Sequence, residues 1–277
     1  MLDSVPADQA AQVLDALGAA LERGDIAAAT ALFADECYWR DLVAFTWNIH
    51  TMEGRDAIAA MLQSQLAATA PAGWRLAEGE AVAEDGGVVT AWIAFETGVA
   101  RGYGLMRLKD GRIWTLLTSM VELKGHEEPV GTHRALGAKH GAAKHRPTWK
   151  EEREAEARDL GTTTQPYVVI VGGGQGGIAL AARLRQLDVP TIVLEKNDRP
   201  GDSWRNRYKS LCLHDPVWYD HLPYLPFPAN WPVFAPKDKL GDWLEMYARI
   251  MELTYWSRST CTSAKYDEAA GAWTVQV

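Results

Sequence analysis

An apolar run that ends in a glycine-rich turn is the feature that most constrains the fold of this chain. The run extends from Tyr167 to Val171, and Gly172, Gly174 and Gly177 follow it with the spacing G-x-G-x-x-G. Parallel strands are buried on both faces and are therefore apolar throughout, and a glycine-rich turn lets the backbone approach a phosphate closely. The pattern predicts a strand, a turn and a helix that together hold a dinucleotide.

Each glycine of the turn has a predicted task. Gly172 allows the tight turn, Gly174 leaves room for a pyrophosphate beside the backbone, and Gly177 lets the following helix pack closely on the sheet. A helix is predicted over residues 178–187, and the pyrophosphate would lie at its positive N-terminus. With 24 glycines in the chain, the spacing alone is weak evidence. An ordinary α/β turn is the alternative.

A glutamate at the end of the next apolar run supports the dinucleotide interpretation. The short β-branched run from Thr191 to Leu194 predicts a second strand, and Glu195 follows it directly. An acid roughly 20 residues past the turn accepts hydrogen bonds from ribose hydroxyls. The same charge would repel a 2'-phosphate, so the turn is expected to hold FAD or NAD rather than NADP. A surface glutamate without a ligand is the alternative.

The composition excludes several classes of partner. A net charge of -8 argues against nucleic acid or an anionic membrane surface. No apolar stretch approaches the roughly 20 residues that span a bilayer, and the start lacks a basic segment followed by an apolar one, so a cytoplasmic protein is expected. Neither a disulfide framework nor a metal site is indicated. The cysteines are odd in number and widely spaced, and the histidines lack the close pairing of a helical metal site. These residues are Cys37, Cys212, Cys261, His126, His133, His140 and His145.

Residues 1–123 show helical patterns first and strand patterns afterwards. Helices are predicted over 13–21, 26–33 and 57–66, and strands over 73–83, 88–96, 100–109 and 112–122, with glycine-containing turns between the strands. This order predicts an α+β domain in which helices pack on a curved antiparallel sheet.

The same segment resembles the SnoaL-like family, whose cone-shaped fold is shared with nuclear transport factors and ketosteroid isomerases. The residues that carry the resemblance are 20–26, 32–39 and 54–58. The resemblance implies either acid-base chemistry in the cone or binding and homodimerisation without catalysis. Asp41, His50 and Arg55 are the polar residues expected to reach such a pocket, with satisfied or surface polar groups as the alternative.

Residues 124–165 are predicted to form a linker that contains a charged helix over 149–160. A Rossmann-type domain is expected over residues 166–277. Beyond the glycine-rich turn, a helix is predicted from about Lys237, and a hairpin over 265–277.

The segment after Glu195 resembles flavin-containing monooxygenases, and among them the indole-pyruvate monooxygenases. The matching residues are Leu194–Lys196, Trp204, Leu211–His214 and Leu222–Pro228. Gly201 is followed by Asp202 where that family commonly has a second glycine. Trp and Arg side chains can stack on a flavin nucleotide or pair with its charge. The expected cofactor-binding set is Gly172, Gly174, Gln175, Gly176, Gly177, Glu195, Lys196, Trp204, Arg205 and His214.

The resemblance implies an FAD-dependent, NADPH-using monooxygenase that oxygenates a small organic substrate through a flavin hydroperoxide. No acid-base residue is singled out as catalytic, because the cofactor carries the chemistry. The family has a second glycine-rich turn for NADPH that this chain lacks, so the chain is expected to end inside the FAD domain. Two alternatives are a non-catalytic FAD-binding module and a SnoaL-like isomerase or hydrolase with a regulatory nucleotide domain.

Overall fold

The structure is a computed structural model that describes residues 4–137, 141 and 144–277. His140 and the residues at positions 1–3 lie outside the described residues. The chain divides into two compact units, and the division falls between Glu127 and Glu128. We refer to them as the N-terminal unit and the C-terminal unit. Among the described residues, no helix is both long and apolar enough to cross a membrane.

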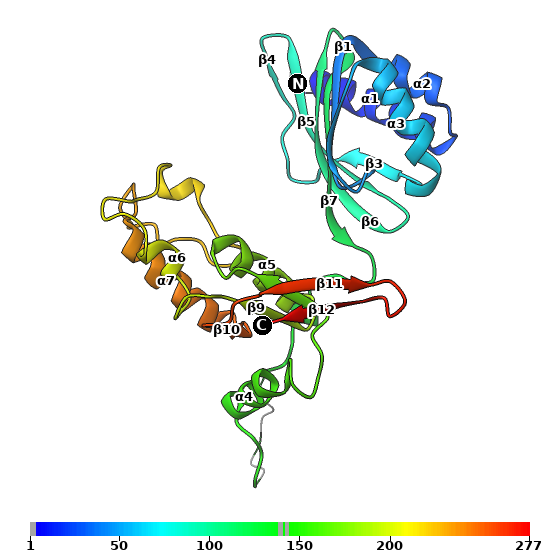
Figure 1. The fold of residues 1–277 in the computed structure, drawn as a ribbon. Helices are drawn as coiled ribbons and strands as arrows, with labels where there is room; N and C mark the ends of the chain where they lie inside the picture. The colour runs from blue at the N-terminus through cyan, green and yellow to red at the C-terminus, as the bar shows by residue number, and fades with distance from the viewer. Residues whose placement is uncertain (1–3, 138–140, 142–143) are drawn as a thin grey trace. The chain divides into compact units, whose positions relative to one another are not determined.

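The N-terminal unit is a strongly curved sheet with three helices, α1 (Ser4–Glu22), α2 (Ile26–Ala31) and α3 (Gly54–Thr69), gathered on one side of it (Figure 1). The described strands follow the order β2-β1-β7-β6-β5-β3, and β4 pairs with β5. The strands are β1 (Phe33–Leu42), β2 (Ile49–Glu53), β3 (Ala72–Leu76), β4 (Ala83–Asp85), β5 (Val88–Glu96), β6 (Ala100–Lys109) and β7 (Arg112–Leu123).

The sheet is mixed rather than antiparallel, which corrects the sequence-based prediction. Strand β1 pairs with β7 in parallel, whereas the neighbouring β6–β7 and β5–β6 pairs are antiparallel as expected. The helix predicted over 26–33 ends at Ala31, because Phe33 begins β1. The strand predicted over 73–83 is interrupted after Leu76 by a turn in which Gly79 has a φ of 80°.

Five aromatic side chains contact one another in the core of the N-terminal unit. Trp39 is fully buried between Phe33, which stacks on it at 5.9 Å between ring centroids, and Phe45, which meets it edge-on at 5.1 Å. Trp74 stacks on Phe95 at 4.6 Å. Such pairs contribute about 0.5–1.5 kcal/mol beyond the area that they bury. These rings lie among a larger number of buried aliphatic side chains, so the interior of this unit is closely packed.

The C-terminal unit is built on a parallel sheet in the order β10-β9-β8. Figure 1 shows α5 and α7 packed near this sheet and the β11–β12 hairpin extending from it. Its elements are η1 (Gly131–His133), α4 (Trp149–Asp159), β8 (Val168–Val171), α5 (Gln175–Gln186), β9 (Thr191–Leu194), α6 (Asp202–Arg205), η2 (Val217–Tyr219), α7 (Lys237–Ile250), β10 (Tyr255–Trp256), β11 (Ser263–Asp267) and β12 (Ala272–Gln276).

The charged helix α4 forms where the sequence predicts it, over Trp149–Asp159. Thr148 and Glu151 form a capping box at its start, which satisfies backbone N–H groups that have no partner within the helix. Just after the helix, Leu160 is buried against Ile192 and Leu194 of β9. The last part of the segment predicted as a linker therefore packs on the C-terminal unit.

Candidate functional site: a nucleotide-binding turn

The turn between β8 and α5 has the geometry that its glycines predict. Gly172 has a φ of 103°, a conformation that side chains rarely adopt. A Cβ atom on Gly177 would lie 2.0 Å from the carbonyl oxygen of Gly172, so this position admits no side chain. The first turn of α5 therefore lies directly against the end of β8.

Two side chains hold the middle of the turn at Gly173. Its N–H donates to Oε2 of Glu195 at 2.8 Å, and its carbonyl oxygen accepts from the Tyr255 hydroxyl at 2.9 Å. Burial raises the pKa of Tyr255, and the nearby charges of Glu195 and Asp202 raise it further, so the hydroxyl remains a donor. The peptide group of Gly173 is thus fixed from both sides.

Glu195 is only 6% exposed, and its carboxylate has acceptor capacity to spare. Oε1 accepts from the backbone N–H of Asn197 at 2.8 Å and from its side-chain amide at 2.7 Å, while Oε2 accepts from Gly173 alone. Two carboxylate oxygens offer about four lone-pair positions. One position on Oε2 therefore remains for a further donor such as a ribose hydroxyl.

The start of α5 fits an anion. Gly174 is its N-cap, and no side chain caps the first turn, so N–H groups at this helix end lack a side-chain acceptor. The hydroxyl of Ser203 is buried without a hydrogen-bond partner, 3.7 Å from the position of a Cβ atom on Gly174. Free donors at a helix N-terminus favour a phosphate. The residues present therefore fit the pyrophosphate of a dinucleotide.

An aromatic pocket of about 270 Å³ lies beside this turn. Trp204 lines it, and its indole N–H donates to Oε1 of Gln175 at 3.1 Å. Trp243 also lines it, and its buried indole N–H has no acceptor. A concave apolar surface with a few polar groups suits a planar aromatic ligand. The other lining residues are Leu213, Tyr219, Asp220, His221, Leu222, Phe227, Leu240 and Leu244.

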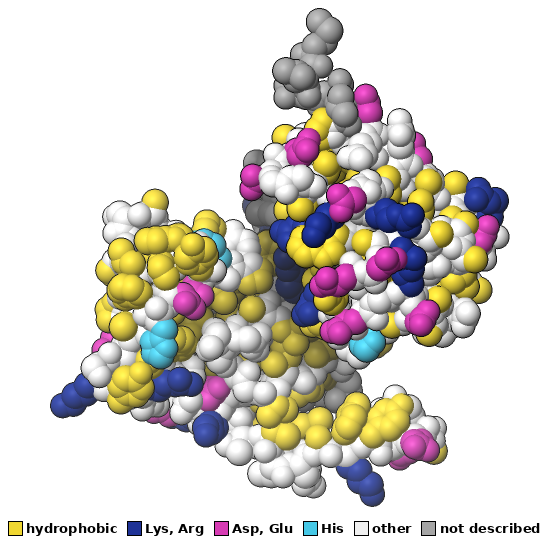
Figure 2. All heavy atoms as spheres, turned by 90° about the horizontal axis from the view of Figure 1, so that it is seen from above, with side chains coloured by type: hydrophobic (Ala, Val, Ile, Leu, Met, Phe, Trp, Pro, Cys, Tyr) yellow, Lys and Arg dark blue, Asp and Glu magenta, His cyan; other side chains and the backbone are white. Residues whose placement is uncertain are grey.

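A loop over residues 218–232 forms much of the outer wall of this pocket. Figure 2 shows hydrophobic side chains gathered on the C-terminal unit, whereas charges of both signs are interspersed over the visible face of the N-terminal unit. Trp218 and Tyr219 in the loop, and Val233 and Phe234 just after it, are among the exposed hydrophobic residues. Tyr224 is held by Arg183, whose guanidinium lies 4.9 Å from the ring centroid, and by a hydrogen bond to Glu128.

The structure gives Arg205 a different role from the predicted one. Its guanidinium is 11% exposed and pairs with Asp202 at 3.0 Å, and with carboxylates of α7 at 2.9 Å and 2.7 Å. The α7 partners are Asp242 and Glu245. Desolvation lowers the pKa of Arg205, but these bonds and charges outweigh it and raise the pKa overall. Because its donors are engaged, Arg205 joins α6 to α7 rather than facing a flavin. Asp202, where a second glycine was expected, serves the same network.

The remaining predicted residues divide into two groups. Gln175, Gly176, Glu195 and Trp204 lie with the other glycines around the turn. Lys196 and His214 are exposed, and neither forms a hydrogen bond or ion pair with any described residue. Sequence reasoning missed Ser203, Asn197 and Tyr255. Ser203 lies beside Trp204 in the matching segment, but a lone tyrosine after α7 carries no recognisable signal.

The three candidate residues of the N-terminal unit do not converge on a pocket. Asp41 is fully buried and accepts four hydrogen bonds, from Thr118, Thr46 (two) and the backbone of Phe45. Arg55 donates to the carbonyl oxygen of Phe33 and pairs with Asp35 at 2.9 Å. His50 is exposed. These contacts favour the alternative interpretation of satisfied or surface polar groups. No group of three or more potential metal ligands occurs in the part of the chain that the structure describes.

Comparisons with known families agree with both halves of this description. Residues 14–116 match the family described as SnoaL-like domain, and residues 170–228 match the family described as NAD(P)-binding Rossmann-like domain. The chain thus combines a SnoaL-like α+β domain with a Rossmann-type α/β domain, and the predicted fold class is confirmed.

The chain is also similar to curated monooxygenases. It is 38% identical over 122 residues to the indole-3-pyruvate monooxygenase YUCCA1 of Oryza sativa subsp. japonica, covering 44% of this chain and 30% of that protein. It is 41% identical over 109 residues to the probable indole-3-pyruvate monooxygenase YUCCA7 of Arabidopsis thaliana, covering 39% of this chain and 25% of that protein. The predicted resemblance to flavin monooxygenases is confirmed, and the chain spans about a third or less of these relatives.

Two solved structures represent the two halves of the comparison. A flavin-containing monooxygenase from Stenotrophomonas maltophilia is 22% identical, with a TM-score of 0.35 and coverage of 39% of this chain and 35% of that one. A ketosteroid isomerase-like protein from Erwinia carotovora atroseptica is 16% identical, with a TM-score of 0.33 and coverage of 40% and 92%.

Proposed function

We propose that the C-terminal unit binds FAD and that this chain carries the flavin-binding part of a flavin-dependent monooxygenase. The observation that carries the proposal is a set of unused polar groups around one glycine-rich turn. The N–H groups at the start of α5, the Ser203 hydroxyl and the free acceptor position on Glu195 are all poised for a ligand. The similarity to monooxygenases supports FAD rather than NAD as that ligand.

The residues have separate roles in this proposal. The turn and Ser203 hold the pyrophosphate, Glu195 accepts from the adenosine ribose, and Trp204 forms one wall of the pocket for the flavin ring. Bound FAD, reduced by NADPH and reoxidised by O2, supplies the redox chemistry for oxygenating a small organic substrate. The protein contributes orientation, and its aromatic pocket limits the access of water to the ring.

The test is the visible spectrum of the purified 277-residue chain. We expect it to take up added FAD in equimolar amount. A colourless protein that takes up no FAD would overturn the proposal. Bleaching of the bound flavin by NADPH without oxygen would speak against the alternative of a non-catalytic FAD-binding module, whereas unbleached flavin fits both that module and a flavin-binding part without an NADPH site.

A glycine substitution makes the spectral test specific to the turn. In Gly174→Ala, the added methyl meets only the Ser203 hydroxyl, at an ordinary 3.7 Å, so the fold is expected to tolerate it. The methyl would nevertheless occupy the space beside the backbone that a pyrophosphate needs. We expect FAD uptake to fall at least tenfold at an unchanged Tm. Gly98→Ala, where a methyl also meets only ordinary contacts, is the matched control.

We also propose that the N-terminal unit forms a homodimer through the open face of its sheet. Along β5, the core residues Ala91, Ile93 and Phe95 alternate with less buried ones, and Trp92 pairs with Leu105, which pairs with Leu117. Trp92 is 38% exposed, and Leu105 and Leu117 are half-buried beside it. A contiguous apolar surface of this kind can serve as an interaction surface. We expect Trp92→Glu to convert a dimer to a monomer in sedimentation. A wild-type chain that is monomeric would contradict this proposal.

A further inference from the structure

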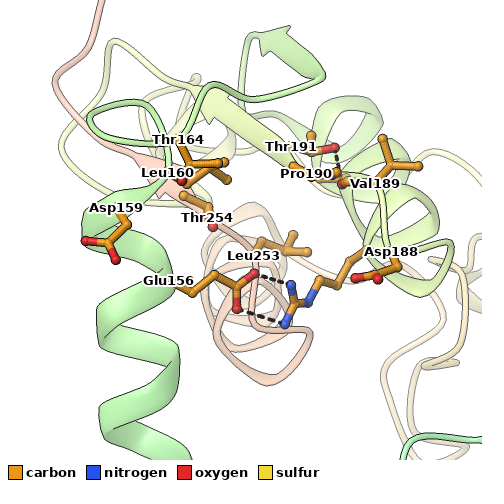
Figure 3. A pocket seen from close by; sticks show the side chains of 12 residues that line it. Glu156, Asp159, Leu160, Thr164, Asp188, Val189, Pro190, Thr191, Leu253 and Thr254 are labelled. Carbon is orange, nitrogen blue, oxygen red and sulfur yellow. Dashed lines mark hydrogen bonds and ion pairs between the residues drawn. The ribbon is translucent and has the colours of Figure 1, made fainter.

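A second pocket, of about 280 Å³, lies at the opposite end of the parallel strands from the glycine-rich turn (Figure 3). Pro190 and Thr191 line it at the start of β9, whereas the turn follows the end of β8. Helix α4 forms one wall through Glu156 and Asp159. Pockets for drug-sized ligands span about 300–1,000 Å³. This pocket therefore suits a smaller molecule.

Thr254 contributes an unused hydrogen-bonding group to this pocket. The residue is 8% exposed, and none of the described residues forms a hydrogen bond with its hydroxyl, whose oxygen is accessible from the pocket. Figure 3 shows the hydroxyl oxygen directed into the space bounded by Leu253 and Glu156. The neighbouring Thr191 hydroxyl is satisfied instead, because it donates to the carbonyl oxygen of Val189 at 2.8 Å. The Thr254 hydroxyl is therefore open to a hydrogen bond from water or from a ligand in the pocket.

Charges of both signs lie at the same pocket. Arg185 of α5 donates to both oxygens of Glu156, at 2.5 Å and 3.3 Å. Burial acts to raise the pKa of Glu156, but Arg185 and Arg153 outweigh it and hold the pKa below its ordinary value, so the carboxylate is charged. Both members of the Glu156–Arg185 pair are partly exposed, and such pairs contribute about 0–1 kcal/mol. A ligand can therefore separate them at little cost.

The acidic groups exceed the basic ones around the cavity. Glu156, Asp159 and Asp188 line it together with Arg185 as the basic side chain. Asp188 forms no ion pair or hydrogen bond through its carboxylate with the described part of the chain. The apolar floor consists of Ala181, Val189, Leu160 and Leu253. The lining thus combines a guanidinium group that can bind an anion, carboxylates that can bind a cation, a hydroxyl and an apolar surface.

We propose that this pocket binds a small zwitterion of the α-amino acid class with an apolar side chain. The ligand carboxylate pairs with Arg185, its ammonium group donates to Glu156 and the Thr254 hydroxyl, and its side chain packs on Leu160 and Leu253. Carboxylates are bound well by the planar guanidinium group of arginine. The site is separate from the proposed FAD site, so its occupancy does not depend on FAD.

The test is binding to the full chain by saturation-transfer NMR, first with a mixture of the protein-forming amino acids and then with L-leucine. We expect saturable binding of L-leucine and at least tenfold weaker binding of 3-methylbutylamine and of 4-methylpentanoate, which lack the carboxylate and the ammonium group respectively. Absence of saturable binding by any amino acid would overturn the proposal. Equal binding of the amine would also overturn it, and would indicate a site for cations.

Two substitutions locate the binding. Thr254→Val keeps the shape of the side chain and removes the hydroxyl, and we expect it to weaken L-leucine binding about tenfold at an unchanged Tm. Arg185→Gln is expected to weaken it at least as much. Arg183→Gln is the matched control. Arg183 lies two residues before Arg185 on the same helix, and it pairs with Glu128 outside the pocket. Unchanged binding in both pocket variants would overturn the proposal.

Discussion

The N-terminal and C-terminal units each contain a buried carboxylate beside a turn, Asp41 and Glu195, and the two differ in how completely they are hydrogen-bonded. Asp41 in the N-terminal unit is 0% exposed and receives four donors, three on Oδ2 and one on Oδ1, and this total is about the capacity of a carboxylate. Glu195 in the C-terminal unit receives three, and one position on Oε2 remains. Burial alone therefore does not mark a functional acid. In the proposed site, the smaller number of donors to Glu195 and its slight exposure leave room for a ligand, whereas Asp41 is closed off in a core.

The largest expected effect concerns Asp41. Asp41→Ala leaves the Thr118 hydroxyl and the backbone N–H groups of Phe45 and Thr46 buried without their acceptor, which we expect to cost about 3–5 kcal/mol of unfolding free energy. Urea unfolding of the N-terminal unit measures this cost. FAD affinity of the C-terminal unit should not change. An unchanged unfolding free energy in Asp41→Ala would contradict a structural role for Asp41.

The next effect concerns Glu195. In Glu195→Gln, one oxygen still accepts from Gly173, but the amide group opposes the N–H donors of Asn197 and lacks the charge that strengthens a bond to ribose. We expect FAD to bind about 10- to 100-fold more weakly, measured by flavin fluorescence titration. Asp198→Asn, three residues along and paired on the surface with Arg258, is the control. Equal loss in both variants would contradict a specific role for Glu195.

A smaller effect, with opposite signs for folding and binding, is expected at Ser203. Its buried hydroxyl has no partner, so Ser203→Ala should leave the Tm unchanged or raise it slightly, whereas FAD affinity should fall about fivefold. Calorimetry and fluorescence titration on the same sample measure the two quantities. A loss of stability together with unchanged affinity would show that Ser203 serves the fold.

The smallest effect is a dependence on alkaline pH at Tyr224. Burial and the hydrogen bond to Glu128 raise the pKa of Tyr224 from 10.0 to about 12. Because the protonated form is favoured in the folded state, its stabilisation is complete below pH 10 and is lost as the pH rises toward 12. The side chain is partly exposed, so we expect a loss of at most about 0.5 kcal/mol. In Tyr224→Phe, the unfolding free energy measured between pH 10 and pH 12 should not show this loss.

Local sequence patterns predicted much of the C-terminal unit. The predicted β9 strand, the helix from Lys237 and the glycine-rich turn all occur where their residues indicate. Each of these depends on interactions between residues close in sequence, such as the approach of Gly177 to Gly172. The strands from Val88 to Glu122 in the N-terminal unit were equally predictable from the sequence, because short turns join them.

Features that depend on distant residues were not predictable. The parallel pairing of β1 with β7 joins segments about 80 positions apart, and the strand β1 carries charged residues that hide its alternation. Tyr255 reaches Gly173 across 82 positions. The role of Arg205 depended on Asp242 and Glu245 on another helix. The sequence does not show which carboxylates the fold brings to a basic residue, so it could not show that Arg205 is already paired.

The loop over residues 218–232 has a consequence for how this pocket can be altered. Its two ends are joined by backbone hydrogen bonds from Leu213 to Ala235 and from Val217 to Val233, so its base is closed like a short hairpin. The loop lines the aromatic pocket together with Gln175 of the glycine-rich turn. Leu222 and Leu225 of the loop pack against the core of α5 and α7, and Phe227 and Trp231 pack against Val217, Ala235 and Leu240. A segment grafted between Val217 and Val233 could therefore reshape the pocket wall only if it kept these apolar positions.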